Sequence, residues 1–176
     1  MRTIFTAAVV LLLSACSTTL PLNYIPSSSV RGDASVTTTS FRYIPSENGE
    51  VKPNQFQKNS ASIGEIHTGT DIASFVETSL KKELSYSGFK LGGPNPLVIS
   101  GNVTRFYYDW IGFTEVDFEV RIDFTVTKDG VEVFKHTAFS HQKAPKTMAQ
   151  DPEAIRAALS SCIDDFFTQA RAKSIL

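Results

Sequence analysis

The clearest pattern in the chain is an alternation of apolar and polar side chains over residues 114–127. From Val116 to Val126 every even-numbered residue is apolar and every odd-numbered residue is charged or polar. A period of two predicts a β-strand with one face on a hydrophobic core and the other in water. Because the alternation is strict, the polar face is expected to be solvated.

Strands are expected on both sides of this one. Lys128-Asp129-Gly130 predicts a tight hairpin turn, so residues 131–141 should return as an antiparallel partner. We expect three residues of that partner to point inward, namely Val131, Val133 and Phe139. Upstream, residues 97–110 form a long strand candidate with Leu97, Ile99, Gly101 and Val103 on one face. Gly101 indicates a bulge or a close backbone approach.

Two segments have the apolar spacing of amphipathic helices. The first is 71–87, with Thr70 or Asp71 as N-cap and Gly88 as its left-handed stop. Its apolar stripe is Ile72, Phe75, Val76, Ser79, Leu80 and Leu84, and Lys81, Lys82 and Glu83 are expected to lie off it. The second is 151–172, with the stripe Ile155, Leu159, Cys162, Ile163, Phe166 and Ala170.

The remaining segments complete a small α+β domain. Residues 34–43 are rich in β-formers and predict a first strand, and residues 45–65 predict a long loop. Two amphipathic helices and a half-exposed sheet can bury their apolar faces by packing against each other. We therefore expect a two-layer sandwich in the order β-α-β-β-β-α, with about four mainly antiparallel strands and both helices on one face.

The N-terminus has the features of a secretory leader. One positive charge precedes an apolar run from Ala7 to Leu13, and Ser14-Ala15-Cys16 follows. The run is too short to span a bilayer permanently. Leu13-Ser14-Ala15-Cys16 resembles the bacterial lipobox, which implies a diacylglycerol thioether on Cys16, cleavage after Ala15 and acylation of the new amino terminus. An ordinary secretory signal with an incidental Cys16 is the alternative.

Three regions follow from that reading. Residues 1–15 are the signal peptide, residues 16–33 are a lipidated tether rich in Ser, Thr and Pro, and residues 34–176 are one α+β domain. Ser17 rather than Asp follows the cysteine, which resembles an outer-membrane address facing the periplasm. Inner-membrane retention under another sorting code is the alternative.

Charge and cysteine content narrow the partners. The chain has 17 basic and 18 acidic residues and no basic block, so nucleic acid is not an expected partner. With Cys16 lipidated, Cys162 has no cysteine to pair with, and its place on a helical stripe favours a buried, inert thiol.

Catalytic motifs are absent from the sequence. There is no Gly-rich phosphate loop, nucleophile elbow, CxxC or HExxH, and we expect neither an enzyme nor a bound metal or cofactor. His136 and His141 are five residues apart on one strand and should face opposite ways. Glu115, Asp117, Glu119 and Asp123 share a face at spacings that overlap acid–base pairs, but Arg121 in the same row favours a solvated surface.

An aromatic cluster at 106–113 is the remaining candidate site. Neighbours on a strand alternate between faces, so these side chains cannot all enter one core. Either they pack under the 45–65 loop, or some form a contact surface for a protein or glycan. The candidate surface residues are Tyr107, Tyr108, Trp110 and Phe113.

The order of elements behind the lipobox resembles the YajG family of bacterial lipoproteins. The similarity lies in the helix ending Leu80-Lys81-Lys82-Glu83-Leu84-Ser85-Tyr86-Ser87-Gly88-Phe89, the strand opening Leu97-Val98-Ile99-Ser100-Gly101-Asn102-Val103, and a last helix beginning near Ala154. It covers about residues 34–173 and brings no catalytic residues. The lipopolysaccharide-assembly lipoprotein and auxiliary lipoproteins of lipid-transport ABC systems are similar in architecture.

These observations lead to one preferred function and two alternatives. We expect a non-enzymatic outer-membrane lipoprotein that binds or scaffolds an envelope protein or glycan, through the aromatic cluster or an exposed sheet edge. The alternatives are an auxiliary subunit of a lipid or lipopolysaccharide transport system and a cell-wall hydrolase.

Overall fold

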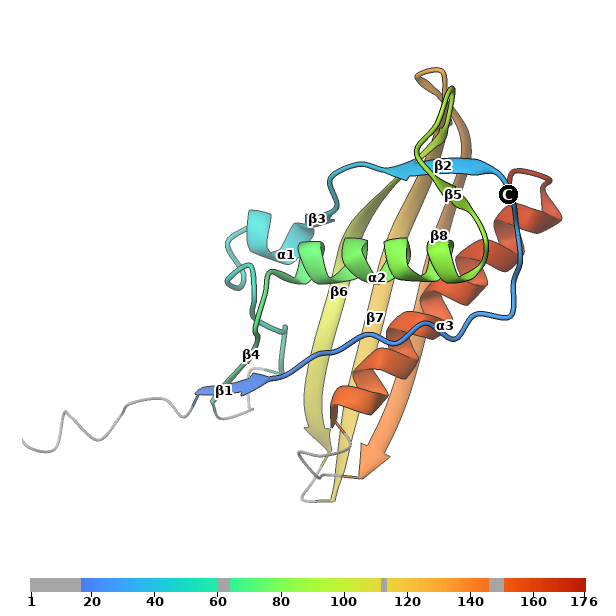
Figure 1. Cartoon of the computed structure of the whole chain (residues 1–176). Coiled ribbons are helices and arrows are strands. Elements are labelled where there is room, and N and C mark those ends of the chain that lie inside the picture. Colours follow the sequence, from blue (N-terminus) through green and yellow to red (C-terminus); the bar gives the residue numbers. More distant parts are fainter. Residues whose placement is uncertain (1–16, 60–63, 112–113, 146–150) are drawn as a thin grey trace, which may run out of the picture.

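The computed structural model describes residues 17–59, 64–111, 114–145 and 151–176. A twisted main sheet lies behind two long helices, α2 (Ile72–Tyr86) and α3 (Asp151–Ala172), which cover one of its faces (Figure 1). The α+β class and the two predicted helices on one face are confirmed. Among the described helices, none combines the length and apolar character needed to cross a membrane.

The main sheet has more strands than the four expected. Its order is β5-β2-β6-β7-β8, and β3 also pairs with β6, which makes six strands. Three long strands form a meander: β6 (Leu97–Ile111), β7 (Glu115–Lys128) and β8 (Val131–Pro145). The short strands β2 (Ser35–Thr38), β3 (Arg42–Tyr43) and β5 (Lys90–Leu91) form the other side. The predicted strand at 34–43 is thus two strands, both parallel to β6.

Phe41, between β2 and β3, lies against Gly101. The side chain of Phe41 packs against this glycine of β6, and a Cβ on Gly101 would lie 2.3 Å from the Phe41 ring. An aromatic side chain, rather than the expected backbone, approaches Gly101 closely, and the bulge in β6 lies further on, between Val103 and Arg105.

The alternation in β7 is borne out along its whole length. The six even-numbered side chains from Val116 to Val126 are buried, and Phe124 stacks on Phe166 of α3 with ring centroids 4.3 Å apart. The odd-numbered residues form the opposite face of the sheet, away from the helices. We call this face the outer face.

The predicted orientation of β8 is wrong. Val131, Val133 and Phe139 are 65%, 39% and 47% exposed, while Ala138 and Ser140 are buried. For Val133 and Phe139 the cause is a bulge in the hairpin, because Thr127 lies opposite Glu132 whereas Val126 lies opposite Phe134. Val131 precedes the bulge and lies opposite Lys128, beside the turn. Val133 is the extra residue, and one extra residue moves every later side chain to the other face.

The stripe of α3 is confirmed and extended, and the stripe of α2 is buried except for Phe75, which is half-buried. All six predicted stripe residues of α3 are buried, and Ala158 and Phe167 join them. Gly88 ends α2 with a φ of 92°, which an L-residue rarely adopts. Cys162 is fully buried, and its thiol donates to the Val120 carbonyl at 3.5 Å. Burial raises the pKa of this thiol to about 12.

The segment expected to be a long loop contains ordered elements. A short helix, α1 (Ile44–Glu47), and a strand, β4 (Glu65–Thr68), lie within residues 44–68. Between them the Gln57 amide donates to the Phe106 carbonyl and the Tyr108 amide donates to the Gln57 carbonyl, each at 2.9 Å. Phe56 is buried beside this contact. The segment therefore packs along β6.

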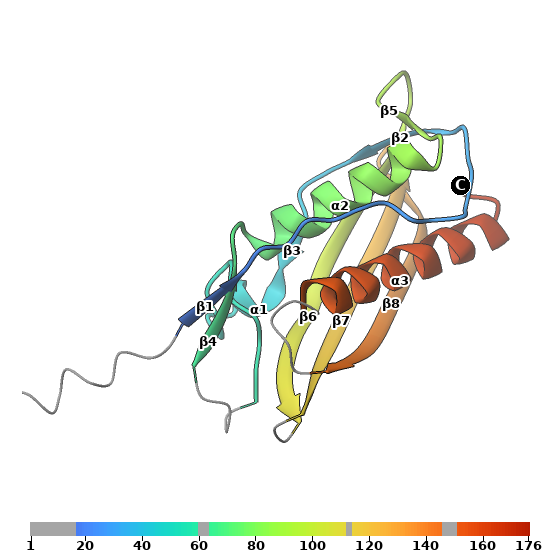
Figure 2. The ribbon, with the colours of Figure 1, turned by 60° about the horizontal axis from the view of Figure 1, so that its bottom comes forward.

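The tether expected over residues 16–33 is not a free linker in its described part. Ser17–Leu20 forms β1, which pairs in parallel with β4 so that Ser17 lies opposite Glu65. Leu20 and Tyr24 are buried. Residues 17–33, which we call the N-terminal strap, then run over α2 and α3 on the side away from the sheet (Figure 2). Buried apolar side chains in the strap explain why it docks despite its Ser, Thr and Pro content.

Candidate functional site

The strap is held to α2 by one buried carboxylate. Glu83 is fully buried, and its Oε1 accepts a hydrogen bond from the Tyr24 hydroxyl at 2.6 Å and from the Ser27 amide at 2.9 Å. Its Oε2 accepts from the Ser28 amide at 3.1 Å. Three donors compensate the desolvated carboxylate, so the contact fixes the strap in one place. Burial, followed by the bond to Glu83, raises the pKa of Tyr24.

Further contacts secure the strap on both helices. Lys82 of α2 donates to the Tyr24 carbonyl at 3.2 Å, and the Ser27 and Ser160 hydroxyls are 2.9 Å apart, which ties the strap to α3. At its far end Arg171 of α3 donates to the Arg31 carbonyl at 3.3 Å. The strap therefore joins α2 to α3 across their outer surfaces.

Glu83 was expected off the buried stripe, and that placement is wrong. Glu83 lies four residues after Ser79 and seven after Val76, both of which are buried. Helical periodicity alone therefore places it on the stripe. The negative charge of Glu83 favoured exposure to solvent. Its three hydrogen-bond donors come from the strap, which the sequence alone indicated to be a linker.

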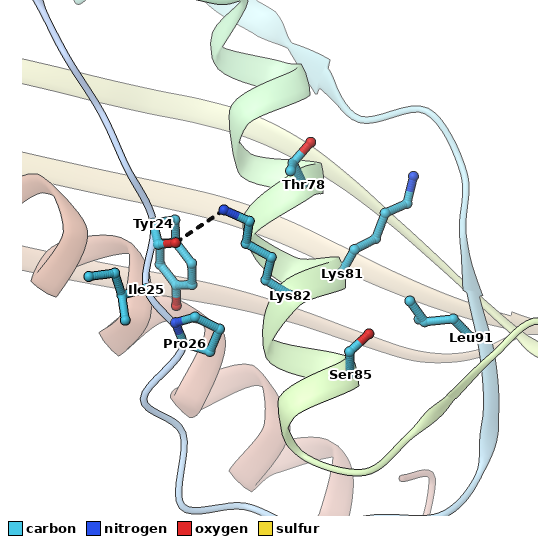
Figure 3. A pocket seen from close by; sticks show the side chains of 8 residues that line it. All are labelled: Tyr24, Ile25, Pro26, Thr78, Lys81, Lys82, Ser85 and Leu91. Carbon is cyan, nitrogen blue, oxygen red and sulfur yellow. Dashed lines mark hydrogen bonds between the residues drawn. The ribbon is translucent and has the colours of Figure 1, made fainter.

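An open groove lies between the strap and the exposed side of α2 (Figure 3). Its volume is about 460 Å³ and it is lined by Tyr24, Ile25, Pro26, Thr78, Lys81, Lys82, Ser85 and Leu91. Ile25 and Leu91 give it exposed apolar walls. Both lysines are already engaged, since Lys81 pairs with Glu77 at 2.8 Å and Lys82 bonds the strap. The groove is thus an apolar surface that offers no acid–base pair.

The predicted aromatic surface is divided between the two faces of the sheet. Tyr108 is buried in the core, where its ring packs edge-on against Phe118 at a centroid distance of 4.8 Å and against Phe56 at 6.2 Å. Its hydroxyl donates to Asp151 of α3 at 3.0 Å. Tyr108 is therefore a core residue, and its assignment to a contact surface is wrong.

Tyr107 lies on the outer face and is half-buried. The Arg105 guanidinium lies over its ring, 4.1 Å from the centroid, and also pairs with Glu119. Its hydroxyl donates to Asp109 at 3.1 Å. Burial, followed by that hydrogen bond, raises the pKa of Tyr107 to about 12. Tyr107 thus remains available as part of a polar and aromatic surface.

Three other predicted site residues lie wholly or partly outside the residues that the structure describes. Cys16, Phe113 and the side chain of Trp110 fall outside the described residues. Ser17, directly after the predicted lipidation site, is the first residue of β1.

The acidic row of β7 has partners on the outer face. Glu119 pairs with Arg105, and Asp123 accepts from the Thr137 hydroxyl at 2.7 Å. Asp117 lies 3.2 Å from the His141 ring nitrogen. Within the described parts of the chain, no group of three His, Cys, Asp or Glu side chains is placed to hold a metal ion. Glu119 and Asp123 therefore contact basic or hydroxyl side chains on an open sheet face.

The two strand histidines face opposite ways, as expected. His136 lies on the helix side, where its Nε2 is 2.6 Å from Asp165 of α3. His141 lies on the outer face. Each histidine contacts a separate carboxylate, so the two cannot act at one centre.

Comparisons with known proteins give a likeness in structure. No protein-family model matches the sequence, and no curated protein matches it significantly. The crystal structure of protein XCC0632 from Xanthomonas campestris, assigned to DUF330, gives a TM-score of 0.66 at 10% identity, over 92% of this chain and 100% of that one. The two chains share a fold. At this identity the likeness says nothing about activity.

Other solved structures resemble the chain in outline. A minor lipoprotein from Acinetobacter baumannii gives a TM-score of 0.46 at 13% identity, over 82% of this chain and 95% of that one. Lipoprotein GNA1162 from Neisseria meningitidis gives a TM-score of 0.39 at 10% identity, over 81% of this chain and 97% of that one. The YajG resemblance stays a prediction.

Proposed function

We propose that the protein is a non-enzymatic lipoprotein that holds an envelope protein or glycan at the outer membrane, facing the periplasm. In this proposal Cys16 is lipidated, and the partner binds to the sheet. The observation that supports this most directly is the position of Ser17, which follows Cys16 and already belongs to β1. An anchor at Cys16 would therefore be attached to the fold itself.

The chemistry of the surface also supports binding rather than catalysis. The outer face presents Tyr107 with its stacked Arg105, an arrangement typical of protein contacts. Across the described residues its carboxylates contact Arg105, Thr137 and His141, as set out above. A hydrolase would need a pair of such groups to converge in a cleft.

Lipidation is tested by changing Cys16. In Cys16→Ala we expect no acyl mass on the chain, by mass spectrometry of the purified protein. A second chain, in which an ordinary secretory leader replaces residues 1–16, is expected in the soluble periplasmic fraction. Ser27→Ala, made in the chain that keeps its own residues 1–16, serves as a control and should remain in the membrane. Recovery of the secretory-leader chain in the membrane fraction would contradict the anchor.

The membrane address is tested at the next residue. Ser17→Asp is expected to move the protein to the inner membrane on a density gradient, while Ser17→Asn is expected to stay in the outer membrane. Asn matches Asp in size but places no charge opposite Glu65 in β4. Equal distribution of both variants would argue against the proposed sorting signal.

A further inference from the structure

Strand β8 presents a long free edge. It runs for 15 residues, pairs with β7 on one side, and within the described residues has no strand on its other side. Unpaired amides and carbonyls along such an edge can add another strand. The bulge at Val133 and the proline at position 145 limit the regular part of the edge to about residues 134–144.

The side chains along this edge carry a defined pattern. Five β8 residues project to the outer face at every second position: Lys135, Thr137, Phe139, His141 and Lys143. Phe139 is 47% exposed at the middle of the row, with the Arg121 guanidinium 5.2 Å from its ring centroid. The two lysines at its ends are about 27 Å apart at strand spacing.

Neither terminal lysine has an ion pair within the described part of the chain. Lys143 lies opposite Asp117, but that carboxylate contacts His141 instead, and Lys135 lies opposite Thr125. From Lys135 to Lys143 the row contains no carboxylate. The edge therefore carries a positive charge at each end and an apolar ring between them.

This pattern argues against a second copy of the chain as the partner. If two β8 edges paired antiparallel about Phe139, Lys135 of each copy would lie opposite Lys143 of the other, on the same face. Outward lysines are a common means of keeping identical edges apart. The same lysines would attract an acidic strand.

We propose that the β8 edge binds an extended segment of another protein that carries acidic side chains eight residues apart and an apolar side chain midway. The segment adds a strand to the sheet, its acids pair with Lys135 and Lys143, and its apolar side chain packs on Phe139. The inference rests on the proposed function only for the compartment in which this partner is met.

The test uses the purified mature protein in detergent micelles and a fluorescent nonapeptide, Asp-Thr-Ser-Thr-Val-Thr-Ser-Thr-Asp. We expect it to bind at least about tenfold more tightly than the same peptide with lysine at both ends. In K135E/K143E the order of the two peptides should reverse. The matched control K128E/K173E makes the same charge change away from the row and should leave the order unchanged.

Hydrogen exchange shows where the peptide lies. The acidic peptide should slow exchange of β8 amides and leave those of β5, at the other end of the sheet order, unaffected. Equal binding by both peptides, no change in K135E/K143E, or self-association of the protein through β8 would each overturn the proposal. Fractionation of the chain with a secretory leader is independent of these measurements, so failure of the anchor and failure of the edge are distinguishable.

Discussion

At the scale of single residues, Glu83 determines whether the N-terminal strap stays docked. Glu83→Ala leaves the Tyr24 hydroxyl and the Ser27 and Ser28 amides without their acceptor. Each such loss costs about 1–3 kcal/mol if the donor stays buried. The strap can detach and rehydrate its donors, so we expect a total loss of about 2–4 kcal/mol in the free energy of unfolding.

Urea denaturation of Glu83→Ala measures that loss. Protease cleavage between residues 20 and 33 should accelerate in parallel. The matched control is Glu153→Ala, whose side chain is 71% exposed and pairs with Arg156 only at 3.8 Å; it should change stability by less than about 0.5 kcal/mol. Equal stability of the two variants would mean that Glu83 does not hold the strap.

Cys162 gives a second residue-scale prediction. Since burial raises its thiol pKa to about 12, the thiolate is rare at pH 8, and the thiol is also inaccessible. Native protein should react with a thiol reagent only at the rate of unfolding, and protein in urea should react at once. Fast labelling of native protein would contradict the burial.

The same shift has a pH consequence with a definite sign. The folded pKa lies above the unfolded value of about 8.5, so the protonated thiol favours the folded state. This stabilisation is fully present below about pH 8.5 and is lost as the pH rises toward 12. Cys162→Ala should flatten that part of a plot of unfolding free energy against pH.

At the scale of elements, β7 defines the two faces of the sheet. Phe124→Asp places a charge against Phe166, 4.3 Å away between ring centroids, and is expected to unfold the domain. Asp123→Ala removes one hydroxyl contact on the outer face and should cost less than about 1 kcal/mol. Circular dichroism and urea titration of both variants test the assignment, and comparable losses would contradict it.

The hairpin bulge supports a second matched pair. Phe134 packs toward Phe166 with centroids 6.1 Å apart, whereas Val133 is exposed. Phe134→Asp should therefore destabilise the domain by about 2–4 kcal/mol, and Val133→Asp by less than about 1 kcal/mol. If thermal unfolding showed Val133→Asp to be the more destabilising variant, Val133 rather than Phe134 would face the core, as the sequence alone predicts.

These elements show how far sequence reasoning reached. The period of β7 and the stripe of α3 predicted their buried faces because local spacing alone decides them. The orientation of β8 was missed because a bulge of one residue, Val133, leaves no mark in apolar spacing. Glu83 was missed because its charge favoured solvent, although its spacing placed it on the stripe and its donors come from a distant segment. Tyr108 was missed because the bulge between Val103 and Arg105 changes which residues of β6 face the core.

At the scale of the whole molecule, the strap sets how the domain would stand on a membrane. β1 lies at one end of the molecule and the turn between β7 and β8 lies at the other (Figure 1). A lipid on Cys16 would place the β1–β4 end against the bilayer, with Lys52, which pairs with Glu65 at 3.3 Å, close to the lipid. The turn at Asp129 would point away from the membrane.

Quenching by spin-labelled lipids measures this orientation. A fluorophore at Lys52→Cys is expected to be quenched strongly and one at Asp129→Cys only weakly, because the buried Cys162 leaves one reactive site in each variant. Inserting about ten Gly and Ser residues between Cys16 and Ser17 should reduce the difference, since a flexible linker lets the domain reorient. Equal quenching without the insertion would contradict a fixed orientation.

The sequence separations of the strap contacts imply an order of events during synthesis. Tyr24 reaches Glu83 across 59 residues, Ser27 reaches Ser160 across 133, and Arg31 reaches Arg171 across 140. In a chain synthesised from its N-terminus, the strap is made well before α3. A lipid attached at Cys16 would therefore at first be joined to the domain by an undocked segment. Folding of the last helix would dock the strap and bring the domain close to the bilayer.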